Sequence, residues 1–173
     1  MIETHHITPA VTSGSPAALV VSLHPMALDD RPFVRATWRE SAKSSPKFDR
    51  LPWPVYKATV GKLIDALIER SDVSLLGAYR GDGKIVGWLA WTPGRSVSTV
   101  HFGYTRHELD GEKLRRRGVF AELLAAASLG KRVAYTFIGP KRQRGATMDV
   151  ALVEWAREQG VTAVHTPIEE FLR

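Results

Sequence analysis

One segment constrains the fold of this chain more than any other. Between residues 100 and 127, a strand-like run, a polar connector and an apolar helix follow one another. The run ends in His-Phe-Gly-Tyr at residues 101–104, and the helix opens with Arg-Arg-Arg-Gly-Val-Phe at residues 115–120. The start of a helix presents unpaired backbone N–H groups and the positive end of the helix dipole. Together with arginine side chains it suits an anionic pyrophosphate, so the segment predicts a phosphate-binding strand–loop–helix.

The length and composition are those of one globular domain. The chain has 173 residues, of which 44% are hydrophobic and 24% charged, enough for a sizeable core. It has no cysteine, and His5 and His6 lack the spacing of metal ligands, so we expect no disulfide and no metal site. There is no apolar run near the roughly 20 residues that span a bilayer, and no pattern of a secretion signal. We expect a cytoplasmic protein with a loose lead-in over residues 1–16 and a single domain over residues 17–173.

The net charge of +6 favours an anionic partner. The basic residues concentrate in three segments after residue 112, namely Lys113, Arg115, Arg116, Arg117, Lys131, Arg132, Lys141, Arg142 and Arg144. Three loops that converge in space would make one basic pocket, which suits a nucleotide cofactor. Nucleic acid and an acidic protein surface are the alternatives.

Hydrophobic periodicity and turn residues divide the chain into ten elements. Apolar runs predict strands at residues 17–23, 73–79, 84–91, 96–104, 132–138 and 161–166. Helical spacing predicts helices at residues 29–42, 55–68, 115–129 and 146–159. The sequence Arg-Gly-Asp-Gly at residues 80–83 predicts a tight hairpin turn between the second and third strands. The predicted order is β-α-α-β-β-β-α-β-α-β, with hairpins first and strand–helix–strand units after them.

This order, with an arginine–glycine turn between the fourth strand and the third helix, resembles the GNAT superfamily of N-acetyltransferases over roughly residues 20–166. The family motif has Arg or Gln, two residues, Gly, one residue, and then Gly or Ala. Arg115 and Gly118 match it and Val119 holds the variable place, whereas Phe120 stands where the family has a small residue. The connector at residues 105–114 is several residues longer than is usual in the family.

The resemblance implies an α/β (α+β) fold, with a mixed, mostly antiparallel central sheet flanked by helices. It also implies acetyl-CoA (coenzyme A) as cofactor, with its pyrophosphate on the backbone N–H groups of the arginine–glycine turn and its 3′-phosphate near a basic loop. The expected cofactor-binding residues are Arg115, Arg116, Arg117, Gly118, Val119, Phe120 and Arg142. For Arg116 and Arg117, an ordinary solvated surface is the alternative.

Acetyl transfer in this family needs a base for the amine and an acid for the leaving thiolate. His101 lies where the fourth and fifth strands would diverge, and a reference pKa of about 6.5 suits a base; a hydrogen-bonded structural histidine is the alternative. The acid in this family is commonly a tyrosine on the helix after the fifth strand, and that helix has no tyrosine here. Tyr104 and Tyr135 are therefore the substitute candidates for the acid; the alternative is that both are packing residues. Glu108 and Glu112 in the connector are candidates for binding a cationic substrate, or are solvated.

The sequence therefore leaves three alternative functions open. The first is an acyl-CoA-dependent N-acetyltransferase that acts by direct transfer on an unidentified primary amine of a small molecule or protein. The second is a catalytically silent GNAT-fold binding or assembly module. A less specific resemblance to divergent bacteriophage-encoded members of the fold implies a virion or host protein as its partner. That resemblance lies in Phe33, Trp38, Ser41, Pro46, Pro52 and Tyr56, followed by a helix and Val73. The third is a basic nucleic-acid-binding protein, whose affinity would fall steeply with added salt.

Overall fold

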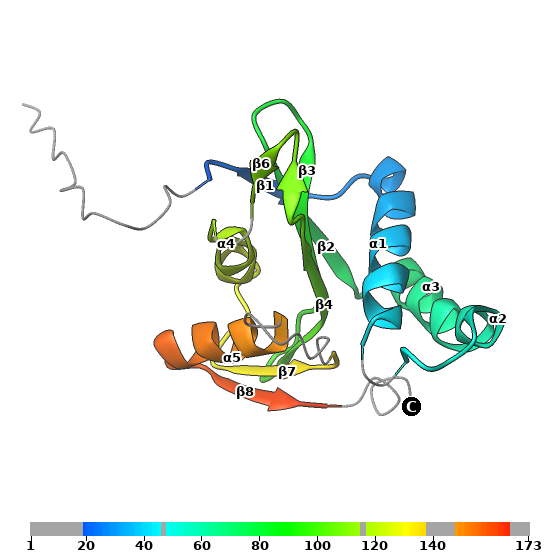
Figure 1. Ribbon diagram of the computed structural model, residues 1–173. Helices are drawn as coiled ribbons and strands as arrows, with labels where there is room; N and C mark the ends of the chain where they lie inside the picture. Colours follow the sequence, from blue (N-terminus) through cyan, green and yellow to red (C-terminus); the bar gives the residue numbers. More distant parts are fainter. Residues whose placement is uncertain (1–18, 46–47, 115–116, 138–147, 167–173) are drawn as a thin grey trace, which may run out of the picture.

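The computed structural model describes residues 19–45, 48–114, 117–137 and 148–166 (Figure 1). The longer strands are β1 (Ser22–Pro25), β2 (Ser74–Tyr79), β3 (Ile85–Thr92), β4 (Ser98–Thr105), β7 (Arg132–Tyr135) and β8 (Thr162–His165). The helices are α1 (Arg31–Lys43), α2 (Trp53–Tyr56), α3 (Lys62–Glu69), α4 (Val119–Ala126) and α5 (Met148–Glu158). A short hairpin of β5 (Glu108–Leu109) and β6 (Glu112–Lys113) lies between β4 and α4.

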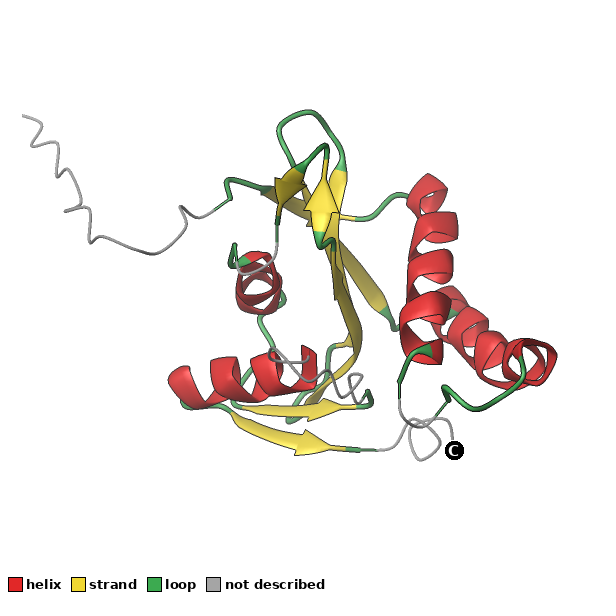
Figure 2. Cartoon of the chain, in the orientation of Figure 1, coloured by secondary structure: helices red, strands yellow, loops and turns green. Residues whose placement is uncertain are grey.

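One sheet runs through the molecule in the order β1-β2-β3-β4-β7-β8. Neighbouring strands from β1 to β4 are antiparallel, whereas β4 pairs with β7, and β7 with β8, in parallel. Helices α1, α2 and α3 lie on one side of the sheet, and α4 and α5 lie on the other (Figures 1 and 2). This arrangement confirms the predicted fold class, a mixed and mostly antiparallel sheet flanked by helices.

Two hydrophobic cores hold the helices on the sheet. On one face Trp38 of α1 packs with Trp88 of β3. On the other face Leu123 of α4 and Leu152 of α5 belong to a second buried cluster, and Trp91 of β3 packs against it. The two tryptophans of β3 thus face opposite sides, as their odd spacing predicts. Because both faces of the central strands are covered, a ligand has to approach them at a strand end or a free strand edge.

Some element boundaries differ from the predicted ones. The first strand is Ser22–Pro25 rather than residues 17–23, because β2 ends at Tyr79, the register partner of Ser22. The helix predicted from residue 115 begins only at Val119, because the preceding Gly118 has a left-handed φ of +80°. The connector, predicted as a loop, contains the β5–β6 hairpin. Its two-residue turn is made by Asp110 and Gly111, both with positive φ.

The other predicted elements are present with small shifts. The helix predicted over residues 55–68 is α2 and α3, joined by the π-helical turn Lys57–Gly61. The predicted lead-in at residues 1–16 lies outside the described residues. None of the helices formed by the described residues has the length and apolar character that a membrane-spanning helix needs.

Candidate functional site

Strands β4 and β7 run side by side over a short distance and then separate. Their register ends at Val100, opposite Tyr135, and the backbone N–H of Thr136 donates one further hydrogen bond to the Val100 oxygen at 3.0 Å. β4 continues to Thr105 with β3 as its partner. Among the described residues, no strand pairs with the other edge of β4 beyond His101. The His101 oxygen accepts a hydrogen bond from the Thr136 hydroxyl at 3.0 Å. Beyond it, the outward backbone groups of β4 have no strand partner in the described part of the chain.

A β-bulge lies at the point where the two strands separate. Trp91 of β3 is opposite Val100, but the preceding Ala90 is opposite Phe102, so His101 is an extra residue in β4. Bulges bend a strand and redirect its side chains, and they occur often beside active sites. Sequence reasoning missed this bulge, because no glycine or proline marks residues 100–102.

His101 is buried at this bulge, with 1% of its surface exposed. Its Nε2 lies 2.8 Å from the hydroxyl oxygen of Thr92. Burial lowers the pKa of His101 to about 4; the positive charge of Arg70 lowers it further, and Asp72 partly opposes the shift. The imidazole is therefore neutral at pH 7, and the lowered pKa makes it a weaker base than an exposed histidine. It is in the predicted place, but it is covered rather than open to a substrate.

Tyr104 and Tyr135 lie on opposite sides of the sheet. Tyr104 faces α1, where it meets Phe33 edge-on with 6.0 Å between ring centroids, and burial raises its pKa. Tyr135 packs against the core beneath α4 and α5 and lies edge-on to Phe137 at 5.9 Å. Tyr135 is at the last paired position of β7, opposite Val100. Tyr104 is four residues further along β4, about 13 Å away along the strand, so the structure does not bring the two phenols together.

The start of α4 has the features expected of an anion site. Gly118 is its N-cap residue, and no side chain among the described residues caps this end. The first intrahelical bond runs from the Glu122 N–H to the Gly118 oxygen, at 3.1 Å. The backbone N–H groups of Val119, Phe120 and Ala121 are the ones that such a helix start leaves without an intrahelical acceptor. They lie at the positive end of the helix dipole, which attracts phosphate.

The side chain of Phe120 points at the sheet. A Cβ atom at Gly103 of β4 would overlap the Phe120 ring, and a Cβ at Gly87 of β3 would come within 3.0 Å of the Val119 side chain. Two strand glycines therefore make room for the first turn of α4, and Phe120 packs against the core. The departure of Phe120 from the family motif is accommodated by Gly103, and its ring does not occupy the solvent side of the helix start.

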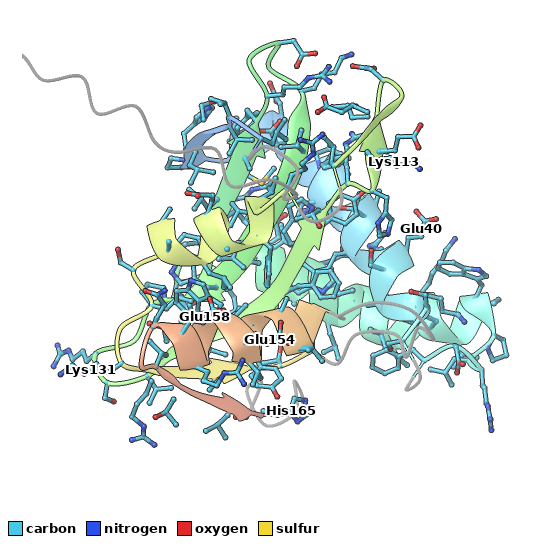
Figure 3. All side chains as sticks on the ribbon, turned by 60° about the vertical axis from the view of Figure 1, so that its left-hand side comes forward. Glu40, Lys113, Lys131, Glu154, Glu158 and His165 are labelled. Atoms are coloured by element: carbon cyan, nitrogen blue, oxygen red, sulfur yellow. The ribbon has the colours of Figure 1, made fainter. Side chains whose placement is uncertain are left out.

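The predicted charged residues are not all free for ligands. Arg117 lies 3.6 Å from Glu112, between Nη2 and Oε1, and its Nε donates to the Lys113 oxygen at 3.4 Å. Glu112 also lies 4.0 Å from a guanidinium nitrogen of Arg80. Glu108 is exposed on β5, and Lys113 projects from the same hairpin (Figure 3). The other predicted cofactor-binding residues, Arg115, Arg116 and Arg142, lie outside the described residues.

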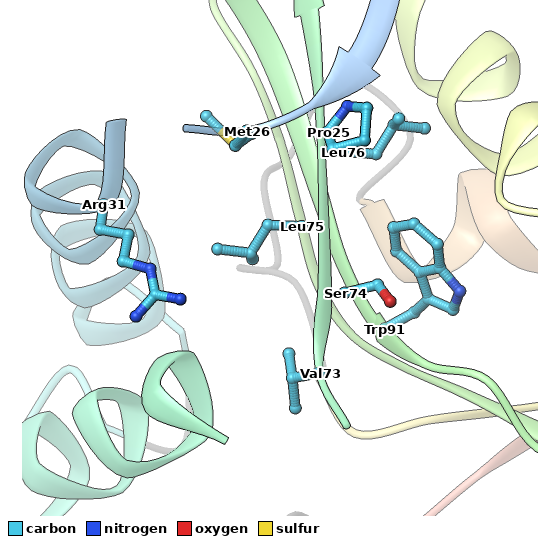
Figure 4. Close-up of a pocket in the computed structure, with 8 residues that line it drawn as sticks. All are labelled: Pro25, Met26, Arg31, Val73, Ser74, Leu75, Leu76 and Trp91. Atoms are coloured by element: carbon cyan, nitrogen blue, oxygen red, sulfur yellow. The ribbon is translucent and has the colours of Figure 1, made fainter. Parts of the chain in front are cut away.

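A pocket of about 380 Å³ lies elsewhere, at the edge of β2 below the end of β1 (Figure 4). It is lined by Pro25, Met26, Arg31, Val73, Ser74, Leu75, Leu76 and Trp91, and it includes none of the predicted site residues. In the described part of the chain, no group of three or more His, Cys, Asp or Glu side chains is placed to hold a metal ion.

Comparison with known proteins gives matches in structure alone. No protein-family model and no curated protein matches the sequence. A histone acetyltransferase HPA2 and related acetyltransferase from Corynebacterium glutamicum matches with a TM-score of 0.50 and 19% identity, over 62% of this chain and 70% of the other. A candidate acetyltransferase from Pyrococcus furiosus matches with a TM-score of 0.50 and 14% identity, over 88% and 89%. A weaker likeness, with a TM-score of 0.43 and 17% identity over 71% and 58%, is to the GNAT family N-acetyltransferase YhbS from Escherichia coli in complex with CoA.

Nothing in these likenesses supports a bacteriophage origin. The two likenesses with a TM-score of 0.50 agree in fold with this mixed, mostly antiparallel sheet flanked by helices. The chain therefore has the fold of the GNAT acetyltransferases.

Proposed function

We propose that this protein is an N-acetyltransferase that takes the acetyl group from acetyl-CoA and transfers it directly to a primary amine. The observation that carries the proposal lies on β4: beyond the His101 bulge, no strand among the described residues pairs with its outward edge. Gly103 on this stretch packs against Phe120 at the start of α4, which no described side chain caps. An extended ligand with an anionic end matches both features, since it would pair with the strand edge and place its charge at the helix start. The fold supports this proposal as an analogy.

In this proposal the pyrophosphate of the cofactor would bind the backbone N–H groups of Val119, Phe120 and Ala121. Arg117 would add a guanidinium, with Arg115, Arg116 and Arg142 as further candidates. The packing of Phe120 against Gly103 supports the assignment, because it turns the ring toward the sheet. When bound, acetyl-CoA supplies a thioester carbonyl for attack by the amine.

The remaining chemistry is proton transfer by this chain. The attacking amine must be neutral, and His101 is our candidate to accept its proton. Because Nε2 is engaged by Thr92 and the ring is buried, the proton would have to pass through the Thr92 hydroxyl or an opening of the bulge. The leaving thiolate needs an acid. Tyr135 is the better placed phenol, since it lies at the last paired position before β4 and β7 separate.

The acceptor is a cationic amine in this proposal, and Glu108 is the more available of the two predicted carboxylates. Glu112 is engaged by Arg80 and Arg117, so its role would be to hold the hairpin rather than the substrate. Glu108 is exposed on the same hairpin, and no ion pair involving it is found among the described residues.

A binding module of the same fold without transfer activity is the second candidate, and the burial of His101 favours it. The two are separated by incubating the protein with isotopically labelled acetyl-CoA and a panel of primary amines, with mass spectrometry as the readout. Label on an amine, dependent on the protein, supports the transferase. No transfer to any amine, together with a stable complex with a protein or nucleic acid, would replace it with the binding module.

A further inference from the structure

The β5–β6 hairpin stands at the same end of the sheet as the turn between β2 and β3 (Figure 1). Both are tight turns with a glycine at positive φ, Gly83 in one and Gly111 in the other. Asp110 precedes Gly111 and also has a positive φ, of +52°, a conformation that aspartate tolerates better than most residues. The hairpin is thus held in a shape that presents the Asp110 carboxylate at its tip.

The side chains of the two turns form one ion-pair network. The Asp110 carboxylate contacts the guanidinium of Arg80, and it lies 2.7 Å from the ammonium of Lys84. Arg80 also holds Asp82 of its own turn, with Nε 3.1 Å from the carboxylate. Hydrogen bonds from Lys84 and then Arg80 lower the pKa of Asp110, so the tip is ionised at neutral pH. Arg80 is the most buried member, with 21% of its side chain exposed against 40–49% for the others named here.

The same network reaches the start of α4 through Glu112. One carboxylate oxygen of Glu112 lies 4.0 Å from Arg80, and the other lies 3.6 Å from Arg117, the residue before Gly118. The chain between them is anchored by Leu114, which is buried in the core and donates its N–H to the His107 oxygen at 2.9 Å. The N–H of Arg117 in turn donates to the Leu114 oxygen at 3.2 Å. The residue that leads into α4 is therefore tied both to the core and to the β2–β3 turn.

We propose that Arg80 is a positioning residue for the phosphate-binding start of α4, acting through Asp110 and Glu112 of the β5–β6 hairpin. The inference rests on the proposed coenzyme A site. Exposed ion pairs contribute little to global stability, so the network is poorly suited to hold the fold together. It is suited to fix where Arg117 and Gly118 lie, and a small displacement of binding groups weakens a site steeply.

Lys84 provides a matched control. Arg80→Gln and Lys84→Gln each remove one positive charge from the same network. Among the described residues, the ion pairs of Lys84 are with Asp82 and Asp110, and none is with Glu112. A long-range electrostatic effect would weaken anion binding equally in both variants. A positioning effect appears in Arg80→Gln alone. Urea unfolding of both variants checks that the fold is kept.

Two readouts test the proposal. Calorimetric titration with coenzyme A should show an affinity about tenfold lower in Arg80→Gln and within about twofold of wild type in Lys84→Gln. Without ligand, NMR hydrogen exchange of the Arg117 and Glu122 amides, which bond to the Leu114 and Gly118 oxygens, should be faster in Arg80→Gln only. If an amine is acetylated, the KM for acetyl-CoA should rise in Arg80→Gln and stay within about twofold of wild type in Lys84→Gln.

Equal coenzyme A affinities in the two variants would overturn the inference. If the wild-type protein does not bind coenzyme A, the proposed function fails, and the exchange rates alone then decide the positioning role. Faster exchange in Arg80→Gln than in Lys84→Gln would still support it, and equal exchange would overturn it.

Discussion

The phenyl ring of Phe120 lies against Gly103, so closely that a Cβ atom at residue 103 would overlap it. Gly103 is on β4, two residues beyond the His101 bulge, and Phe120 is in the first turn of α4. The contact therefore joins β4, beyond the point where its pairing with β7 ends, to the helix that starts at the candidate phosphate site. It also explains how a bulky side chain is accepted at this place in the motif.

Adding a methyl group at this contact should destabilise the protein. We expect Gly103→Ala to lower the free energy of unfolding by about 1–2 kcal/mol, because the Phe120 ring has to move. Replacing the ring by the smaller leucine side chain in Gly103→Ala/Phe120→Leu should remove the clash. The effects of the two substitutions on the free energy of unfolding will therefore not be additive. Gly81→Ala is the control, since a Cβ there meets no atom within 4 Å. Equal urea unfolding of Gly103→Ala and Gly81→Ala would show that the contact is absent.

The burial of His101 predicts a pH-dependent stability. The pKa of His101 is about 4 in the folded protein, below the ordinary value of 6.5. Between these two pH values the histidine is protonated in the unfolded chain but neutral in the folded protein, which favours unfolding. The contribution of His101 to stability is constant above pH 6.5 and declines as the pH falls toward 4, by about 3 kcal/mol at most. Urea unfolding between pH 7 and 4 should show this decline in wild type and in the exposed-site control His165→Gln, but not in His101→Gln. The same slope in all three proteins would refute the buried, neutral state.

The positions of the two tyrosines predict different kinetic effects. Tyr135 lies where β4 and β7 separate, and Tyr104 is about 13 Å further along the strand. Tyr135→Phe should therefore lower kcat about 100-fold, and Tyr104→Phe should change it by less than about threefold. Acetyl-transfer kinetics on one amine, with both proteins checked for an unchanged unfolding midpoint, provide the test. A large loss of kcat in Tyr104→Phe, with none in Tyr135→Phe, would mean that the acid lies on the α1 side of the sheet.

Substitutions of the two glutamates of the hairpin should affect different ligands, the amine in one case and coenzyme A in the other. Glu108 is exposed, so Glu108→Gln should raise the KM for a cationic amine about tenfold and leave coenzyme A affinity unchanged. Glu112 pairs with Arg117, so Glu112→Gln should alter coenzyme A affinity and leave the amine KM unchanged. Titration and steady-state kinetics on both variants measure the split. Identical effects would mean that the hairpin acts as one unit.

The fold was predictable because its signals are local. The Arg-Gly-Asp-Gly turn at residues 80–83 joins β2 and β3 as predicted, and the spacing of Trp88 and Trp91 placed them on opposite faces. The Asp110–Gly111 pair is also a strong hairpin signal. It was missed because the strands beside it are two residues long and lack an alternating apolar pattern.

The site was less predictable because it depends on contacts between distant residues. The bulge at His101 arises from the pairing of β3 with β4, and the histidine's pKa depends on Arg70 and Asp72, about 30 residues earlier in the chain. Arg117 and Glu112 were expected to bind different ligands, yet the hairpin brings them together as an ion pair. Periodicity cannot show either relationship.

The measurement that bears most directly on the central claim is calorimetric titration of acetyl-CoA, with ATP as the control for charge. The proteins are wild type, Gly118→Asn and Gly118→Asp. Both side chains tolerate the left-handed φ of residue 118, and a Cβ there meets no atom within 4 Å, so the two variants differ only in a negative charge at the phosphate site. We predict micromolar binding selective for acetyl-CoA, kept in Gly118→Asn and lost in Gly118→Asp. Equal affinity of the two variants, or no selectivity over ATP in wild type, would contradict a coenzyme A site at the start of α4.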